Sequence, residues 1–274
     1  STDAEGFTTM RPVSWDYRFS NLCNFKCRMC GDMLSSSWEA ESRKNKTWTK
    51  ESQPWMASPL REQIIKFQDT QVVQEFVEAV ETKRIKEIYW CGGEPLMWDM
   101  HWKAMQRIIE LGFAKEVYVR YNTNLSRVSY KGIELFDLLP KFKHVNLCAS
   151  IDGVGKVGEY IRTGLKWEEW LENFKRGLPL INNFGNDAMV FDVTLTTPGL
   201  FGLKELFDVV TELNVKSYFK FTFAFDPSVV MSPLCLPKSI LEDTVQELLE
   251  YIEPRMTDKT HVYKTSLVNL LNRQ

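Results

Sequence analysis

The sequence predicts an α/β protein built as a partial (βα)6 TIM-like barrel with parallel strands. Three observations lead to this prediction: strand-like and helical segments alternate six times, polar motifs follow the strands, and several strands alternate apolar with polar residues. Alternating strands and helices favour a parallel sheet with right-handed crossover connections. In such barrels the chemistry takes place at the carboxyl ends of the strands, so the motifs are expected to meet there.

Hydrophobic periodicity assigns the individual elements, with a period of 2 for strands and 3.6 for helices. The expected strands cover residues 13–20, 85–91, 116–121, 145–151, 189–196 and 217–225. The expected helices cover residues 34–44, 60–82, 99–111, 131–138, 167–182, 202–213, 238–252 and 258–272. Residues 45–59 contain tryptophans and prolines and are predicted to be an irregular insertion, either a lid or a loop packed on the barrel exterior.

The chain divides into three expected segments. Residues 1–12 are polar and contain glycine and proline, so they are predicted to form a flexible lead-in. Residues 13–252 form the predicted core domain, and residues 253–274 form a predicted C-terminal helical extension. A first residue other than methionine is consistent with a processed or tagged protein, or with part of a longer polypeptide.

Composition narrows the class of protein. The 274 residues include 34 Lys and Arg against 36 Asp and Glu, and this net charge of −2 argues against a nucleic-acid or membrane-surface binder. The sequence has no apolar run long enough to span a membrane and no secretory signal, so we expect no membrane partner. Clustered cysteines fit the reducing cytoplasm better than a disulfide framework.

Three cysteines, Cys23, Cys27 and Cys30, lie within eight residues, directly after the first expected strand. Thiolates are soft ligands that select zinc, copper(I) or an iron–sulfur cluster. A structural zinc site needs a fourth protein ligand, and no histidine or second CxxC lies near this loop in the sequence. The residues therefore indicate a metal site, with an iron–sulfur cluster and structural zinc as the alternatives.

The CxxxCxxC spacing resembles that of the radical S-adenosylmethionine (radical SAM) superfamily. The resemblance implies that Cys23, Cys27 and Cys30 hold a [4Fe–4S] cluster whose open iron chelates S-adenosylmethionine (AdoMet). It also implies reductive cleavage of AdoMet, hydrogen abstraction from a substrate by the 5′-deoxyadenosyl radical, and an electron donor such as flavodoxin or ferredoxin. Low cluster potentials require anionic thiolate ligands and restricted solvent.

The sequence Gly92-Gly93-Glu94-Pro95 follows the second expected strand. Glycine lets a ligand approach the backbone closely, although the same four residues could form a plain strand-to-helix turn. The segment is similar to the GGEP motif of the radical SAM superfamily. The resemblance implies that its backbone and Glu94 receive the amino group of AdoMet.

Further segments extend the resemblance over residues 13–225. Thr123 and Asn124 resemble a TNG-like segment, with leucine in place of the glycine. Ser150 and Asp152 resemble an SIDG segment that contacts the ribose and carboxylate of AdoMet.

Arg162 matches a residue that pairs with the AdoMet carboxylate, for which a guanidinium fork is well suited. The alternative for this arginine is a surface position near the start of a helix.

The nearest branch of the superfamily is the one with SPASM or twitch auxiliary domains, and the chain departs from it twice. Met29 occupies a position that is often aromatic. Only Cys235 follows the residues 13–225 that carry the resemblance, so the cysteines of this chain do not suffice for a second cluster. An auxiliary domain before the core, or a partial chain, would explain the second departure.

The remaining thiols are candidate hydrogen-atom donors to a substrate radical, and Cys148 and Cys235 are the residues we assign to this role. Cys91 is the third thiol outside the loop and has the same two interpretations. The alternative for each is a free cysteine that behaves as a small buried apolar residue.

The strand alternation predicts a polar barrel lumen. The polar strand positions include Arg18, Arg120 and Lys220, opposed by Asp16 and Asp192. Because strands buried on both faces are usually apolar throughout, these polar residues are expected to line a wet cavity. We predict that a substrate presents a carboxylate or another anionic group to one of the cations. The alternative is an ion-pair network in which the charges satisfy one another.

The leading hypothesis is therefore a radical SAM enzyme that acts on a peptide or protein side chain. One alternative is the same chemistry on a small polar metabolite or a nucleotide-derived substrate. The other is a protein that binds metal for a structural purpose.

Overall fold

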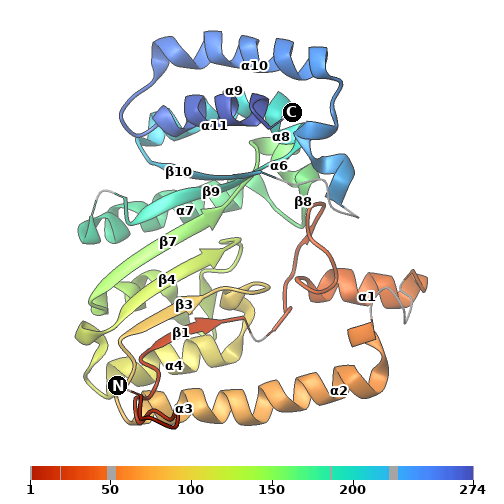
Figure 1. Ribbon diagram of the computed structural model, residues 1–274. Helices are drawn as coiled ribbons and strands as arrows, with labels where there is room; N and C mark the ends of the chain where they lie inside the picture. Colours follow the sequence, from red (N-terminus) through yellow and green to blue (C-terminus); the bar gives the residue numbers. More distant parts are fainter. Residues whose placement is uncertain (1, 19, 48–53, 186, 222–227, 274) are drawn as a thin grey trace.

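The computed structural model describes residues 2–18, 20–47, 54–185, 187–221 and 228–273. Six parallel strands form one open sheet in the order β1-β3-β4-β7-β9-β10 (Figure 1). Their bounds are β1 (Ser14–Tyr17), β3 (Glu87–Trp90), β4 (Tyr118–Thr123), β7 (His144–Ser150), β9 (Met189–Leu195) and β10 (Ser217–Phe221). The predicted α/β class and parallel sheet are confirmed, whereas the predicted strand positions 19 and 222–225 lie outside the described residues.

The helices agree with most of the predicted segments. They are α1 (Ser36–Asn45), α2 (Ser58–Phe67), α3 (Val73–Glu81), α4 (Asp99–Glu110), α5 (Leu135–Leu138), α6 (Gly155–Ile161), α7 (Trp167–Ile181), α8 (Thr197–Phe201), α9 (Leu203–Leu213), α10 (Lys238–Ile252) and α11 (His261–Leu271). The helix expected over 60–82 is divided by a π-helical turn at Gln68–Val72. The short helices α6 and α8 were not predicted, because five to seven residues give little periodicity to detect.

The helix expected over 131–138 begins instead with a hairpin. Strands β5 (Ser129–Tyr130) and β6 (Ile133–Glu134) pair antiparallel, and only α5 of the expected helix remains. Lys131 and Gly132 between these strands both have positive φ, which suits the tight turn of a two-residue hairpin.

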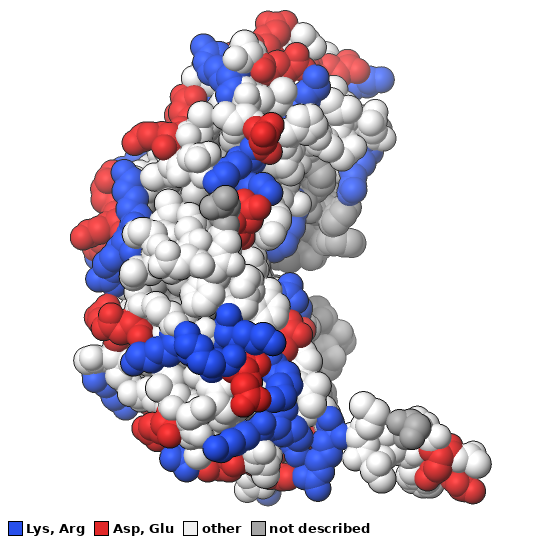
Figure 2. Space-filling model, turned by 90° about the vertical axis from the view of Figure 1, so that its left-hand side faces the viewer, with Lys and Arg blue, Asp and Glu red and all other residues white. Residues whose placement is uncertain are grey.

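The apolar face of the sheet packs against the helices. In β4, Val119 and Tyr121 are fully buried and alternate with partly exposed residues. In β9, the ring of Phe191 meets the rings of Trp170 and Phe174 from α7 edge-on, at centroid distances of 5.2 and 4.7 Å. Each such side chain stabilises the fold by about 1.5–3 kcal/mol. The polar residues of the same strands consequently point to the concave side of the molecule, which is C-shaped in profile (Figure 2).

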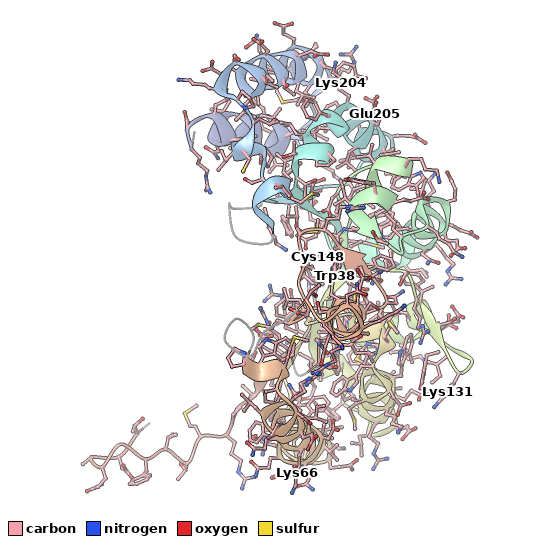
Figure 3. All side chains as sticks on the ribbon, turned by 90° about the vertical axis from the view of Figure 1, so that its right-hand side faces the viewer. Trp38, Lys66, Lys131, Cys148, Lys204 and Glu205 are labelled. Atoms are coloured by element: carbon pink, nitrogen blue, oxygen red, sulfur yellow. The ribbon has the colours of Figure 1, made fainter. Side chains whose placement is uncertain are left out.

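The two ends of the chain differ in packing. Residues 2–12 are exposed and extend away from the sheet (Figure 3). In α11, Tyr263 is buried against Phe219 of β10, with 4.6 Å between ring centroids, and its hydroxyl lies 3.1 Å from Ser217 Oγ. The segment expected to be a C-terminal extension therefore covers the β10 end of the sheet. None of the helices in the described ranges combines the length and apolar character needed to cross a bilayer.

Candidate active site

A cavity of about 710 Å³ lies at the carboxyl ends of the strands, the face viewed in Figure 3. Most of the predicted site residues line it. They are Cys23, Cys27, Cys30, Gly92, Gly93, Thr123, Asn124, Ser150 and Arg162, together with Arg18 and Lys220. The structure thus brings residues of all five motif segments to one place, as expected for parallel strands that end at a common edge.

The beginning of α1 holds the cysteine loop through its backbone. Cys23 N donates to Ser36 Oγ at 3.0 Å, and Ser37 Oγ donates to Cys23 O at 2.8 Å. Trp38 Nε1 donates to Cys27 O at 2.9 Å. These contacts were missed from the sequence, although the run of three serines before Trp38 was a visible signal for them. They fix the loop while leaving the cysteine side chains free to face the cavity.

A short antiparallel pair connects the loop to the Arg162 segment. Strand β2 (Lys26–Cys27) pairs with β8 (Arg162–Thr163), and Cys27 lies directly opposite Arg162. Arg162 Nη1 is 3.9 Å from Cys27 Sγ. This pairing places a buried guanidinium beside the thiols.

All six cysteines are free thiols. Burial raises the pKa of Cys23 to about 12, whereas the hydrogen bond with Cys27 lowers the pKa of Cys30. Among the described residues, no three His, Cys, Asp or Glu side chains are arranged as ligands of one metal ion. An iron–sulfur cluster has different requirements, because each thiolate binds its own iron. Three thiols on one cavity wall, beside a cationic group, are a suitable donor set for such a cluster.

Gly93 is required by packing on the cysteine loop. A Cβ at this position would lie 2.4 Å from Leu22 O and 2.8 Å from Asn21 O. Gly93 N donates to Ser20 O at 3.1 Å, which ties the turn to the chain entering the loop. Gly92 has φ of 120°, a backbone conformation that favours glycine. Glycine is thus required at position 93 by a close backbone contact and favoured at position 92 by its backbone conformation. Both residues line the cavity.

Glu94 does not have the environment that the family resemblance implied. Its side chain is buried and is not part of the cavity lining within the described residues. The carboxylate accepts hydrogen bonds from Thr123 Oγ1 at 2.7 Å, Asn124 N at 2.6 Å and Leu96 N at 3.0 Å. Burial raises the pKa of Glu94 to about 7. In this structure Glu94 joins the turn to the end of β4, and its contact with the amino group of AdoMet stays a prediction.

Arg162 and Asp152 form a buried ion pair. Arg162 Nε lies 2.7 Å from Asp152 Oδ2, and Nη2 donates to Oδ1 at 3.0 Å. Asp152 also accepts from Thr194 N at 2.8 Å and does not itself line the cavity. Because Arg162 is only 9% exposed, the alternative of a surface position is wrong. Two guanidinium nitrogens are engaged by Asp152, and the third is directed toward Cys27.

The concave strand face carries a chain of hydrogen bonds across four strands. Tyr89 Oη donates to Asn122 Oδ1 at 2.6 Å, and Asn122 Nδ2 donates to Asp192 Oδ2 at 2.6 Å. Lys220 Nζ lies 2.6 Å from the same Asp192 oxygen. The strand alternation predicted this polar surface, and all four residues line the cavity.

Each of the three predicted lumen cations has an acidic partner. Besides the Lys220 pair, Arg18 Nε lies 3.2 Å from Asp16 Oδ1. Arg120 Nη1 lies 3.5 Å from Glu87 Oε1, its guanidinium lies 4.8 Å from the ring centroid of Tyr89, and it is not part of the cavity lining. In this structure Arg120 pairs with Glu87 on the neighbouring strand, and its contact with a substrate stays a prediction.

The three thiols outside the loop differ in burial and in their position relative to the cavity. Cys148 is buried, lies 3.6 Å from Asn146 Oδ1, and has its pKa raised to about 11 by burial. Cys235 is exposed. Neither belongs to the described cavity lining, whereas Cys91 does, with Sγ 3.0 Å from Asp16 Oδ1. The hydrogen-donor role of Cys148 and Cys235 stays a prediction.

The tryptophan-rich insertion is described only in part. Trp48 and its neighbours to residue 53 lie outside the described residues. Trp55 lines the cavity, and the guanidinium of Arg61 in α2 lies 5.6 Å from its ring centroid. This end of the insertion consequently forms a wall of the site.

Comparison with known proteins gives one family and one set of structures. The sequence profile described as the radical SAM superfamily matches residues 17–200. No curated protein matches the chain. Among solved structures, native anSMEcpe with bound AdoMet is similar at a TM-score of 0.50 and 15% identity, over 88% of this chain and 60% of that one. Native anSMEcpe with bound AdoMet and a Kp18Cys peptide matches at a TM-score of 0.50 and 14% identity, with the same coverage. The chain thus spans about 60% of the length of these proteins, and at such identity the likeness concerns the fold.

Proposed function

The chain belongs to the radical SAM superfamily, and from this premise we propose that it cleaves AdoMet reductively and abstracts hydrogen from a peptide or protein side chain. Membership implies a [4Fe–4S] cluster and AdoMet as cofactors. The observation that carries the proposal is the position of Cys23, Cys27 and Cys30 on one wall of a cavity that the other family motifs also line.

The three cysteines would hold the cluster, and the surrounding residues would hold AdoMet. When bound, this pair supplies one-electron cleavage of a carbon–sulfur bond and a hydrogen-abstracting radical. Arg162 can bind a carboxylate through the guanidinium edge that Asp152 leaves open. Gly92 and Ser150 line the cavity and can bind polar groups of the ligand. Asp152 would act indirectly by orienting the guanidinium of Arg162. Glu94 would orient the turn.

A neighbouring groove favours an extended substrate. The groove has a volume of about 600 Å³ and shares Arg18, Ile64 and Gln68 with the cavity. Trp15 and Phe67 add apolar surface to its lining. A peptide lying in this groove can place one side chain in the cavity, which is the reason we prefer a peptide or protein substrate.

The concave strand face would bind the inserted side chain. Arg18 and Lys220 are more than half exposed, at 66% and 56% of their side chains. Ion pairs of this kind contribute little net free energy, so either cation can exchange its acidic partner for an anionic substrate group. We propose this exchange as the way in which substrate is recognised.

The alternative substrate is a small polar metabolite or a nucleotide-derived compound. The specific observation in its favour is the volume of the main cavity, about 710 Å³, which is in the usual range for small-ligand sites. Family membership argues against the non-enzymatic alternative, a structural metal-binding protein.

We also propose a placement within the family and the cell. The motif pattern favours the SPASM or twitch branch, although only Cys235 follows the residues 13–225 that carry the resemblance. Six free thiols suit a reducing compartment, so we place the enzyme in the cytoplasm. The electron donor would be a carrier such as flavodoxin or ferredoxin.

The experiment is anaerobic reduction of the reconstituted enzyme with dithionite in the presence of AdoMet and deuterated substrates. One set consists of peptides with perdeuterated residues, and the other consists of deuterated small metabolites. We expect deuterium in 5′-deoxyadenosine with the peptides. Cys27→Ser is the control that should form no 5′-deoxyadenosine. Transfer from the metabolites alone would reverse the substrate assignment, and absence of AdoMet cleavage by the wild-type enzyme would refute the proposed function.

A further inference from the structure

The two edges of the sheet differ in how they are covered. Strand β10 at one edge packs against α11, where the ring centroid of Tyr263 lies 4.6 Å from that of Phe219. Among the described strands, β1 at the other edge pairs only with β3, and its residues Ser14 and Asp16 are exposed. Figure 1 shows this edge with α2 and α3 running below it. The side of β1 that faces away from β3 is called the free edge below.

The main-chain groups on the free edge can be identified from the pairing of β1 with β3. Val13 O accepts from Glu87 N at 3.1 Å, so the carbonyl of Val13 faces β3. Main-chain directions alternate along a strand, and the N–H and C=O groups of Ser14 and Asp16 are therefore turned away from β3. In the part of the chain that the structure describes, no backbone hydrogen bond from another element reaches these two residues. An unpaired edge of this kind can accept a further strand.

The groove of about 600 Å³ lies between β1 and α2. Its lining combines Trp15 of β1 with Ile64 and Phe67 of α2. None of the ten described residues of α2 is buried, and Phe67 is 54% exposed. The groove thus has a strand with free main-chain groups on one side and apolar side chains on the other. Recognition of an extended peptide by strand addition uses these two kinds of surface, the first for the peptide backbone and the second for its side chains.

A strand added to the free edge would present its side chains to two different places. Trp15 points toward the helices, since its ring meets that of Phe76 in α3 edge-on at 5.8 Å between centroids. Asp16 and Arg18 point to the opposite, concave side, and Arg18 lines both the groove and the main cavity. The side chains of an added strand alternate in the same way. Those beside Trp15 would therefore enter the apolar groove, and those between them would face the side of the cavity.

We propose that the substrate is an extended peptide that binds as an additional strand on the free edge of β1 and places apolar side chains, at alternate positions, in the groove. This inference rests on the proposed function. Continuity with the cavity favours a peptide over a second copy of this chain as the occupant, because Arg18, Ile64 and Gln68 line both spaces. The peptide backbone supplies affinity that does not depend on sequence, and the groove selects apolar side chains near the residue that enters the cavity.

The test starts from peptides selected for binding. A phage-displayed library of random peptides, about twelve residues long, is selected on the reconstituted full chain without reductant or AdoMet. One enriched sequence is then synthesised with a fluorescent label, and its dissociation constant is measured by anisotropy. We expect enriched sequences to carry apolar residues at alternate positions. Methylation of single peptide amides should weaken binding by about tenfold at every second position and by less than about threefold between them, because only alternate amides face β1.

Two pairs of variants test the protein side of the contact. Phe67→Ser should weaken peptide binding about tenfold, whereas Phe201→Ser, at a phenylalanine of α8 that is 55% exposed, should stay within about twofold of the wild type. Asp16→Pro removes an N–H from the free edge, and Asp16→Ala loses the same carboxylate but keeps the N–H. The proline variant should bind about tenfold more weakly than the alanine variant. Circular dichroism and iron content verify that each variant is folded and loaded.

Absence of any enriched peptide, or a methylation profile without the period of two, would overturn the proposal. Equal binding by the wild type and Phe67→Ser would also overturn it. A wild-type dimer in sedimentation velocity that Asp16→Pro dissociates would show that a second copy of the chain occupies the free edge instead. Failure of the proposed function is distinguishable from all of these outcomes: the wild type would then bind the peptide with the period of two and still cleave no AdoMet on reduction.

Discussion

The cysteine loop and the concave strand face line the same cavity but use their polar side chains differently. Around the loop, α1 binds the backbone, for example through Ser37 Oγ and Cys23 O at 2.8 Å, and the thiols face the cavity. On the strand face, side chains bind one another, as Lys220 and Asp192 do. The loop thiols are therefore available to a cofactor. The strand-face side chains could bind a substrate group only by giving up their present partners.

The largest expected effect is the loss of a loop thiol. Cys23→Ser, Cys27→Ser or Cys30→Ser should each cost most of the iron, because a cluster needs every thiolate this loop supplies. Cys148→Ser is the control, since Cys148 is buried away from the cavity lining. Iron analysis after anaerobic reconstitution measures the effect. Full iron retention in Cys27→Ser would contradict the view that the loop thiols are the groups that hold a cofactor.

The second-largest effect is expected at the Arg162–Asp152 ion pair, which connects the cysteine loop to the strand face. Arg162→Ala leaves the buried Asp152 carboxylate unpaired, and loss of one partner of a buried pair costs roughly 3–5 kcal/mol. We expect that decrease in the free energy of unfolding, measured with denaturant. The double variant Arg162→Ala/Asp152→Asn should recover part of the loss. Equal stability of the single and double variants would show that the loss does not come from the unpaired Asp152 carboxylate.

Gly93→Ala tests the packing of the loop on the GGEP turn. The added Cβ would lie 2.4 Å from Leu22 O, so the backbone must shift. A destabilisation of roughly 1–3 kcal/mol follows from such overpacking, together with weaker iron binding. Gly31→Ala is the matched control in the same loop, because a Cβ there meets no atom within 4 Å. Similar unfolding curves for the two variants would contradict this account of Gly93.

The smallest expected effect on stability is on the strand face. Lys220→Met should lower the free energy of unfolding by less than Arg162→Ala does, because the ammonium is half exposed and the buried Asp192 keeps the hydrogen bond from Asn122 Nδ2. Transfer of substrate deuterium should nevertheless fall, while cleavage of AdoMet without substrate continues. Lys216→Met is the control, since Lys216 is also a partly exposed, ion-paired lysine but does not line the cavity. Equal substrate turnover in both variants would show that Lys220 takes no part in recognition.

Much of the fold and part of the site were predictable from the sequence. Strand alternation gave the sheet and its polar concave face, and the cysteine spacing located the loop. The β2–β8 pair was not predictable, because Cys27 and Arg162 are 135 residues apart and two-residue strands carry no periodic signal. The environment of Glu94 was also missed, since it depends on where β4 ends relative to the turn. The partner of Arg120 was missed because Glu87 lies on a different strand, and the pairing register of the two strands is not visible in the sequence.

The most direct test of the central claim is the electron paramagnetic resonance spectrum of the reduced, reconstituted protein, recorded with and without AdoMet. The claim is that the loop thiols hold a cluster with one iron open to that cofactor. We predict about four iron and four sulfide per chain, and a spectrum that changes when AdoMet is added. Bound zinc without sulfide, or a cluster spectrum that AdoMet leaves unchanged, would contradict the claim.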